Sequence, residues 1–486
     1  MTEAQLAGPL VMVDVPDPVL SLDTAAHLRR HGIRAVCLFG KNIRDEAQVR
    51  ALVADLREVM GEDALIAIDQ EGGGVFRTDF SPFAPSAMCL GSADDEELAR
   101  DVGAAVARPL AALGINWNFA PVLDVNVDSR NPVIGDRSFG PDSGRASQLA
   151  LAWLDGCASE GVAGCVKHFP GHGDTHLDSH LALPRVDKPR AVLNAVELAP
   201  FQMAIRAGVP AIMTAHIVFP ALDPDLPATL SKAVLTDLLR KELGFEGVVI
   251  TDSMGMAAID GHFGRGEAGV LALRAGADLV MALGRREAQE ATLAAMGEAL
   301  RSLEVEDRLA RIHALASRFR ARPRSYESET ADADEALFDG AWRRGLTAVG
   351  SPILPKLGGR VTLVALHGVD RSFVSEAGVR GERIAEHLRG LYDLETVFVN
   401  APEEVDWPAL RASGRFLILA TTSRLRQAGW RTATPDLHLA LWNPYAVLDV
   451  AAPALVTYGY RAGALRAAAA CLGGEFEPHA RPFIFH

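Results

Sequence analysis

The chain has 486 residues, 49% of them hydrophobic and 23% charged, which is typical of a globular protein large enough for two or more domains. Its formal net charge of −14 at pH 7 argues against nucleic-acid binding, because that function depends on concentrated Lys and Arg. Its five cysteines form no Cys-x-x-Cys pair, so they predict reduced thiols instead of a disulfide framework or a zinc ribbon.

The beginning of the sequence and its apolar stretches predict no export signal and no membrane contact. Residues 1–10 include Glu3 and lack a basic start followed by a long apolar core. No later stretch reaches the roughly 18 uninterrupted apolar residues of a membrane span. We therefore expect a cytoplasmic protein with neither nucleic acid nor membrane as a partner, and the composition leaves monomer and homodimer open.

Short apolar runs alternate with longer amphipathic segments over the first 300 residues or so. Apolar runs that do not alternate with polar residues are typical of parallel strands buried on both faces. Eight such runs with helical segments between them favour a (β/α)₈ barrel, with a doubly wound sheet as the alternative. The runs are residues 10–15, 33–39, 65–68, 115–121, 162–166, 211–213, 248–250 and 279–283.

Polar side chains follow the apolar runs, where the active site of such a barrel should lie. Each has an ordinary structural alternative: Asp252 could cap a helix, Arg137 could pair with Asp136 or Asp142 on the surface, and Lys167 could form a buried ion pair with Asp69. A single active site explains all of these polar residues at one rim, whereas the structural alternatives require a separate explanation for each residue. The residues that follow the third to seventh runs are Asp69, Glu71, Asp124, Lys167, His168, His216 and Asp252.

The segment 167–180 contains four histidines, spaced every fourth residue: His168, His172, His176 and His180. On a helix this spacing would suggest a metal site. Pro170 and the glycines beside it disfavour a helix, and no His-Glu-x-x-His signature is present. The segment therefore predicts an irregular, metal-free catalytic loop, with a polar surface loop as the alternative.

The rest of the chain predicts a second, smaller α/β domain. We expect the barrel to occupy residues 1–320, a charged, Ser-containing linker residues 321–344, and the second domain residues 345–486. No Gly-x-Gly-x-x-Gly or Walker loop supports a nucleotide site in it. Further apolar runs, which indicate a mainly parallel sheet, are residues 361–366, 396–399, 416–420, 437–441 and 454–458.

Several motifs in this order resemble those of the family-three glycoside hydrolases, and among them the bacterial β-N-acetylglucosaminidases of peptidoglycan recycling. The motifs are IDQEGG (68–73), APVLDV (120–125), IGDRSFG (134–140), KHFPGHG (167–173), DSH (178–180) and TDSMGM (251–256). The segment LWNPY (441–445) is a weaker echo of the family's second domain. The resemblance thus spans the barrel and implies a TIM-like barrel followed by an α/β sandwich domain.

The resemblance also implies roles for individual residues. Asp252 would be the nucleophile of a retaining mechanism, and His180, oriented by Asp178, would be the acid/base. An imidazole with an ordinary pKa of about 6.5 can donate and accept a proton near neutral pH. The residues expected to hold the sugar are Asp69, Arg137, Lys167 and His168.

By the same resemblance the enzyme removes terminal, non-reducing β-linked N-acetylglucosamine from muropeptide or chitin-type fragments, without a metal or organic cofactor. Alternative functions are phosphorolysis of the same glycosides, because a His repels phosphate less than a Glu does, and a broader β-glucosidase or β-xylosidase. An inactive sugar-binding protein is the alternative outside enzymes, and the retention of Asp252 and of the Asp178–His180 pair disfavours it.

Overall fold

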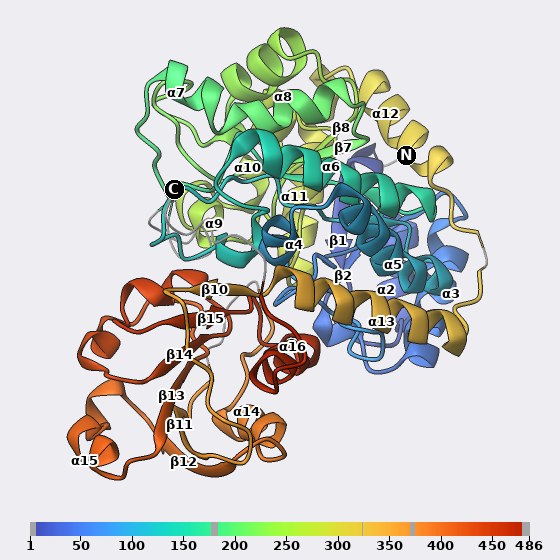
Figure 1. The fold of residues 1–486 in the computed structure, drawn as a ribbon. Helices are drawn as coiled ribbons and strands as arrows, with labels where there is room; N and C mark the ends of the chain where they lie inside the picture. The colour runs from blue at the N-terminus through green and yellow to red at the C-terminus, as the bar shows by residue number, and fades with distance from the viewer. Residues whose placement is uncertain (1–5, 176–182, 323, 370–374, 479–486) are drawn as a thin grey trace.

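The computed structural model describes residues 6–175, 183–322, 324–369 and 375–478. They form two domains, a larger one coloured blue to yellow in Figure 1 and a smaller one coloured orange to red. None of the described helices combines the length and the apolar character that crossing a membrane requires. The fold agrees with the two α/β architectures that the sequence predicts.

The first domain is a closed barrel of parallel strands. β1 pairs with β2 on one side and with β9 on the other, and the remaining neighbours follow around the ring. Cys165 separates β5 from β6, and a bridge between Ile250 and Leu279 joins β8 to β9. A doubly wound sheet would have two free edges, so the circular pairing excludes that alternative. The strands are β1 (Val11–Asp14), β2 (Ala35–Leu38), β3 (Leu65–Ile68), β4 (Trp117–Asn118), β5 (Ala163–Gly164), β6 (Val166–Phe169), β7 (Ala211–Thr214), β8 (Val248–Ile250) and β9 (Val280–Met281).

Helices surround the barrel because each buries one apolar stripe against it. In α3, the residues Val49, Leu52, Val53 and Leu56 are buried at helical spacing, and Asp45 caps the helix by accepting a hydrogen bond from the amide of Gln48. The α-helices are α2 (Leu22–His31), α3 (Glu46–Met60), α4 (Ala87–Ala93), α5 (Glu96–Leu113), α6 (Ser143–Ser159), α7 (Arg190–Ala195), α8 (Leu198–Arg206), α9 (Ala257–Phe263), α10 (Arg265–Ala275), α11 (Arg286–Ala299) and α12 (Glu306–Arg318), and η5 (Ala233–Glu242) is a π-helix. The barrel's short 3₁₀ helices are η1 (Gly8–Leu10), η2 (Gly40–Asn42), η3 (Gly135–Arg137), η4 (Ala228–Leu230) and η6 (Leu300–Ser302).

The second domain is a six-stranded sheet in the order β10-β15-β14-β13-β11-β12, with buried apolar clusters on its two faces. All neighbours are parallel except β10, which runs antiparallel to β15. The strands are β10 (Thr347–Val349), β11 (Arg360–Leu366), β12 (Asp393–Val399), β13 (Phe416–Thr421), β14 (Leu437–Ala440) and β15 (Ala454–Val456). The helices are α14 (Gly381–Leu388), α15 (Trp407–Ala412), α16 (Ala462–Leu472), η7 (Pro402–Glu404), η8 (Ala428–Thr432) and η9 (Pro444–Leu448).

The stretch 321–344, expected to be a linker, contains most of a helix, α13 (Ser328–Gly345). Phe338, Ala341, Trp342 and Gly345 are buried at the spacing of one helical face, and the charged residues that suggested a linker occupy mainly its other faces. The helix packs against α4 and α5 of the barrel and against α16 of the second domain. The domains are therefore connected by a packed helix and not by an open linker.

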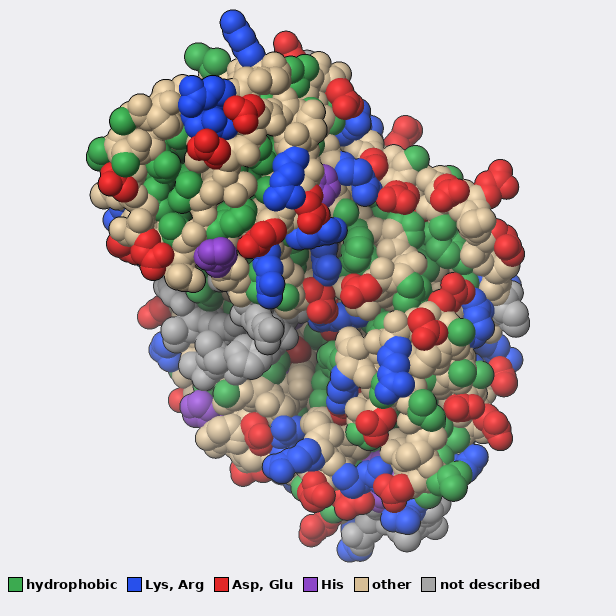
Figure 2. Space-filling view, turned by 90° about the horizontal axis from the view of Figure 1, so that it is seen from below, with side chains coloured by type: hydrophobic (Ala, Val, Ile, Leu, Met, Phe, Trp, Pro, Cys, Tyr) green, Lys and Arg blue, Asp and Glu red, His purple; other side chains and the backbone are tan. Residues whose placement is uncertain are grey.

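The second domain contacts barrel loops that follow β3 and β4. Tyr445 Oη accepts a hydrogen bond of 3.0 Å from Asn126, and Ser86 donates one of 2.7 Å to the carbonyl of Tyr458. On the face shown in Figure 2, acidic and basic side chains are interspersed. That face has no extended basic field of the kind that binds nucleic acid.

Candidate active site

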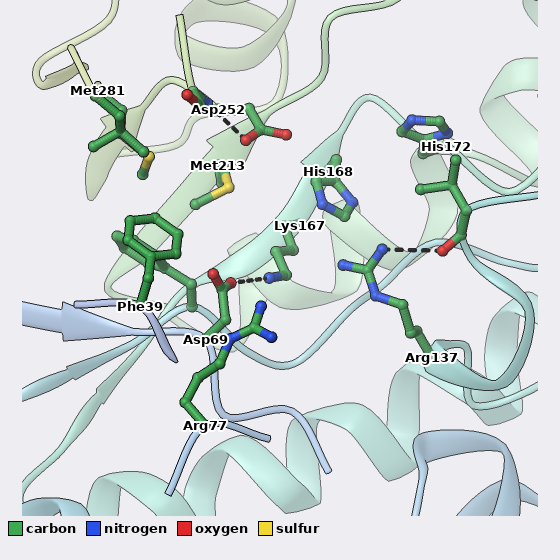
Figure 3. Close-up of a pocket in the computed structure, with 14 residues that line it drawn as sticks. Phe39, Asp69, Arg77, Arg137, Lys167, His168, His172, Met213, Asp252 and Met281 are labelled. Atoms are coloured by element: carbon green, nitrogen blue, oxygen red, sulfur yellow. Dashed lines mark hydrogen bonds and ion pairs between the residues drawn. The ribbon is translucent and has the colours of Figure 1, made fainter. Parts of the chain in front are cut away.

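A pocket opens at the carboxyl ends of the barrel strands, with about 660 Å³ of empty space when its open mouth is included. Figure 3 shows polar side chains that lie on or just after β3, β6 and β8, and apolar ones that lie on or just after β2, β7 and β9. The lining residues are Phe39, Asp69, Arg77, Phe119, Val133, Arg137, Lys167, His168, His172, Met213, Asp252, Ser253, Met281 and Leu283. Five residues expected from the sequence, Asp69, Arg137, Lys167, His168 and Asp252, thus share one pocket, whereas Asp178 and His180 lie outside the described residues.

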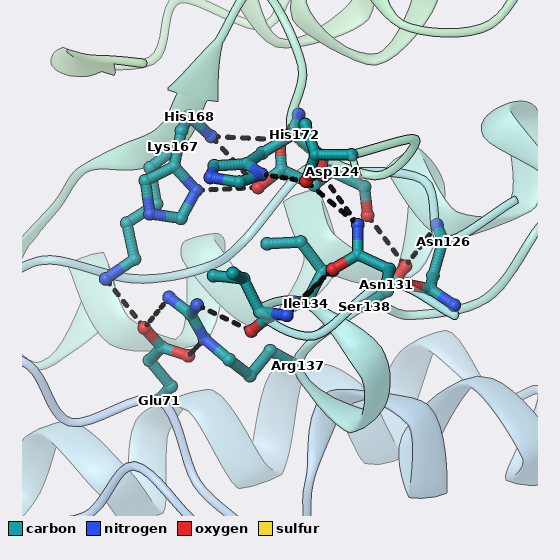
Figure 4. Close-up of polar contacts among 12 residues, drawn as sticks. Glu71, Asp124, Asn126, Asn131, Ile134, Arg137, Ser138, Lys167, His168 and His172 are labelled. Carbon is teal, nitrogen blue, oxygen red and sulfur yellow. Dashed lines mark hydrogen bonds and ion pairs between the residues drawn. The ribbon is translucent and has the colours of Figure 1, made fainter. Parts of the chain in front are cut away.

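A buried carboxylate, Glu71, holds two of the three cationic side chains of the pocket in place. It accepts two hydrogen bonds of 2.8 Å from Arg137, and its Oε1 lies 2.6 Å from Lys167 Nζ. Burial alone would raise the pKa of Glu71, but the charges of Arg137 and Lys167 outweigh it and hold the pKa well below its usual range. Glu71 is therefore a stable anion, and the paired geometry fixes the guanidinium plane (Figure 4).

Lys167 joins this cluster to the floor of the pocket. Its ammonium group donates a hydrogen bond of 2.7 Å to Asp69 Oδ1, in addition to its ion pair with Glu71. Burial lowers the pKa of Lys167, yet the carboxylates of Asp69 and Glu71 raise it above its ordinary value overall. An ammonium group has three N–H donors, and two of them are directed at Asp69 and Glu71. The third can therefore donate a hydrogen bond to a bound hydroxyl group. The ion pair with Asp69 expected as a structural alternative does form, and both partners line the pocket.

Asp124 organises the loop that follows β6. Its carboxylate lies 2.6 Å from His168 Nδ1 and accepts hydrogen bonds from the amides of His168 and His172, the latter at 2.7 Å. Burial would raise the pKa of Asp124, but His168 and His172 lower it overall. Because a carboxylate only accepts, Nδ1 of His168 carries the proton and Nε2 remains for the pocket.

The backbone packing of this loop explains its glycines. A Cβ on Gly173 would lie 1.7 Å from the carbonyl oxygen of Val125, so only glycine allows this approach. Asn131 donates a hydrogen bond of 2.8 Å to the carbonyl of His172, and His172 Nδ1 lies 2.8 Å from Thr175 Oγ1 (Figure 4). The described part of the loop, residues 170–175, is irregular, as Pro170 and the glycines predict.

Asp252 lies two residues beyond β8, on a segment fixed from both sides. Thr251 donates its amide to Leu279 at 3.0 Å and accepts the amide of Met281 at 2.9 Å, which anchors the turn to β9. The amide of Ser253 donates a hydrogen bond of 2.6 Å to Asp252 Oδ1, and His216 Nε2 lies 2.9 Å from the Ser253 carbonyl. His216, which the sequence places after the sixth run, thus supports the segment and does not line the pocket.

Arg137 does not have the surface partners that the sequence suggested. It is buried and pairs with Glu71, whereas Asp142 caps α6 by accepting a hydrogen bond from the amide of Arg145. Asp136 is also buried. The surface ion pair that the sequence offered as a structural alternative does not form, because the loop 134–140 folds inward and Arg137 lines the pocket.

The sequence did not predict every residue that lines the pocket. Glu71 and Asp124, which the sequence places at the ends of apolar runs, do not line it themselves and instead hold Arg137, Lys167 and His168 in place. Arg77, whose guanidinium pairs with Glu376 of the second domain, comes from an irregular stretch without any pattern. Phe39, Met213 and Met281 belong to apolar runs in the sequence, so only the folded barrel shows that they line the pocket.

The comparisons with known proteins identify the family of the chain. The profile described as "Glycosyl hydrolase family 3 N terminal domain" matches residues 4–315. The β-hexosaminidase of Chromobacterium violaceum is 38% identical over 296 residues, which cover 60% of this chain and 82% of that protein. β-Hexosaminidase A of Pseudoalteromonas piscicida is 39% identical over 277 residues, 52% of this chain, and the chain spans about half of that relative, 46% of its length.

A solved structure matches both domains. The family 3 β-N-acetylglucosaminidase from Paenibacillus sp. str. FPU-7 superposes with a TM-score of 0.89 at 34% sequence identity, covering 99% of this chain and 98% of that one. The profile match, the curated relatives and this two-domain likeness lead to the same conclusion: the chain belongs to glycosyl hydrolase family 3 and is a glycoside hydrolase.

Proposed function

We propose that the enzyme is a retaining exo-β-N-acetylglucosaminidase that removes terminal β-linked N-acetylglucosamine from muropeptide or chitin-type fragments. The observation that carries the proposal is the position of Asp252 in one pocket with Asp69, Lys167 and Arg137. The specificity is supported by relatives that are named β-hexosaminidases or β-N-acetylglucosaminidases.

The polar cluster would bind the hydroxyl groups of a single terminal sugar. Lys167 and Arg137 offer charged donors held in place by buried carboxylates, while Asp69 offers an acceptor. Charge-assisted hydrogen bonds are strong and directional, so they suit recognition of one ring orientation. The apolar side of the pocket, with Phe39 and Met281, would pack against the ring face or the leaving group.

The reaction would follow the double displacement of retaining glycosidases. The carboxylate of Asp252 attacks the anomeric carbon while His180 protonates the departing glycosidic oxygen. A covalent glycosyl-aspartate forms, and His180 then removes a proton from the water that hydrolyses it. Asp178 would hold the imidazole in the required tautomer; Asp178 and His180 both lie in the segment 176–182, outside the described residues.

The acid/base role is tested with two substrates and two variants in phosphate-free buffer. His180→Ala should lose about 10²–10⁴-fold in kcat/KM on an N-acetylglucosamine disaccharide, and far less on 4-nitrophenyl N-acetyl-β-glucosaminide, whose leaving group needs little protonation. His176→Ala, in the same segment of the sequence, is the matched control and should retain activity on both substrates. Equal losses of His180→Ala on both substrates would contradict the assignment.

Two further comparisons separate the alternative activities. The wild-type enzyme should prefer the acetamido substrate over 4-nitrophenyl β-glucoside, and equal turnover would favour a broader β-glucosidase. Adding phosphate should leave the rate and the free-sugar product unchanged. Formation of a sugar phosphate would instead identify a phosphorylase.

A further inference from the structure

Two histidines and a glutamate form a compact cluster outside the catalytic pocket. His27 and His31 lie one turn apart on α2, and Glu290 lies on α11. One ligand atom from each lies within 4.8 Å of the others, and His27 Nδ1 is 3.7 Å from Glu290 Oε1. None of the three lines the pocket.

The imidazoles of this cluster are buried without the hydrogen bonds that burial normally requires. His27 is 2% exposed and His31 is 9% exposed. Nδ1 of His31 has no hydrogen-bonding partner in the described structure, and neither ring nitrogen of His27 has one of normal geometry, although the Gln289 side chain lies near that ring. Buried polar atoms are rarely left unsatisfied, and a missing ion is one of the ordinary reasons.

We propose that His27, His31 and Glu290 bind a divalent transition-metal ion, Zn²⁺ in the first place. Two imidazoles and a carboxylate are a donor set that Zn²⁺ accepts, with bonds of about 2.0–2.2 Å. Tetrahedral geometry then separates ligand atoms by about 3.3 Å. The side chain of Glu290 is 46% exposed, so it has room to close the remaining gap and leaves a fourth position to water.

The position of the cluster gives the ion a structural role. α2 follows β1 and α11 follows β9, and these two strands pair where the barrel closes, with Val11 opposite Val280. A metal ion bound to both helices would fasten the first βα unit to the last. It would stabilise the folded barrel because it binds only where both helices are in place.

The test is zinc binding by the full-length protein after chelator treatment, measured by competition with a chromophoric chelator. Glu290→Gln should weaken binding by about 10-fold or more and His31→Ala by about 100-fold. Arg286→Gln removes a nearby positive charge and should tighten binding several-fold. His313→Ala, an exposed histidine on α12, is the matched control and should bind like the wild type.

A second measurement keeps the proposal testable if His31→Ala fails to fold. Zn²⁺ should raise the melting temperature of the wild type and of His313→Ala, and not that of Glu290→Gln, whose changed side chain lies at the surface. The proposal is overturned if the wild type does not bind Zn²⁺, or if Glu290→Gln and Arg286→Gln bind as the wild type does. The latter result would place the ion elsewhere, for example at the histidines of the catalytic rim.

Discussion

Replacing Glu71 by Gln tests the buried charge cluster that holds the pocket together. Glu71 and Asp69 balance the charges of Arg137 and Lys167, so the variant leaves one positive charge uncompensated in a buried site. Breaking a buried ion pair by removing one partner costs about 3–5 kcal/mol. We expect that loss in the free energy of unfolding at pH 7, together with a raised KM, because neither cation keeps its geometry.

The assay is chemical denaturation, with Glu46→Gln as the matched control. Glu46 pairs with Arg50 on the exposed face of α3, where such a pair contributes about 0.3–0.5 kcal/mol. The folded-state pKa of Glu71 lies below its unfolded value of about 4.3, so its contribution is complete above that pH and is lost as the pH falls. The difference between wild type and Glu71→Gln should therefore shrink below about pH 4. A loss under 1 kcal/mol at pH 7 with an unchanged KM would refute the reasoning.

Three further predictions concern the loop after β6 and the helix between the domains. Asp124→Asn removes the negative charge and one of the two acceptor oxygens that fix His168. The variant should lower kcat/KM by about 10–150-fold, the value of one charge-assisted hydrogen bond, with melting temperature as the control. Burial, with the charge of His168, lowers the folded-state pKa of His172 to about 4. Between pH 6.5 and pH 4 the unfolded state therefore takes up a proton that the folded state does not. The free energy of unfolding of the wild type should fall by up to about 3 kcal/mol over this range. His172→Gln should flatten that decline in pH-dependent denaturation, and an identical slope would count against the burial of a neutral imidazole. Trp342→Ala empties a buried site on α13 and should cost about 3–5 kcal/mol, measured by denaturation; a loss below 1 kcal/mol would show that the helix does not couple the domains.

The sequence was sufficient for the barrel because its strands are buried on both faces and therefore appear as plain apolar runs. It was insufficient for β10, a short, partly exposed edge strand with no comparable run. The sequence did not predict the helix α13 for a related reason. Charged residues dominate its composition, and only every third or fourth residue lies on the buried face that includes Trp342. Elements that are completely buried can therefore be predicted from their apolar runs, whereas half-exposed elements such as β10 and α13 are harder to predict.

The pocket shows the same limit at the level of single residues. The position of Asp252 after β8 could be predicted because the end of an apolar run is visible in the sequence. The partner of Arg137 could not, since Glu71 is 66 residues away and meets it only when the barrel closes. Choosing between a nearby Asp136 and a distant Glu71 requires knowing which way the loop folds.

The measurement that bears most directly on the proposed mechanism is mass spectrometry of the enzyme after reaction with a 5-fluoro N-acetyl-β-glucosaminyl fluoride, a substrate whose glycosyl-enzyme hydrolyses slowly. The proposal predicts one covalently bound sugar on the peptide that contains Asp252, and none in the Asp252→Asn variant. A sugar attached to another carboxylate, or turnover of the reagent without any covalent intermediate, would contradict it.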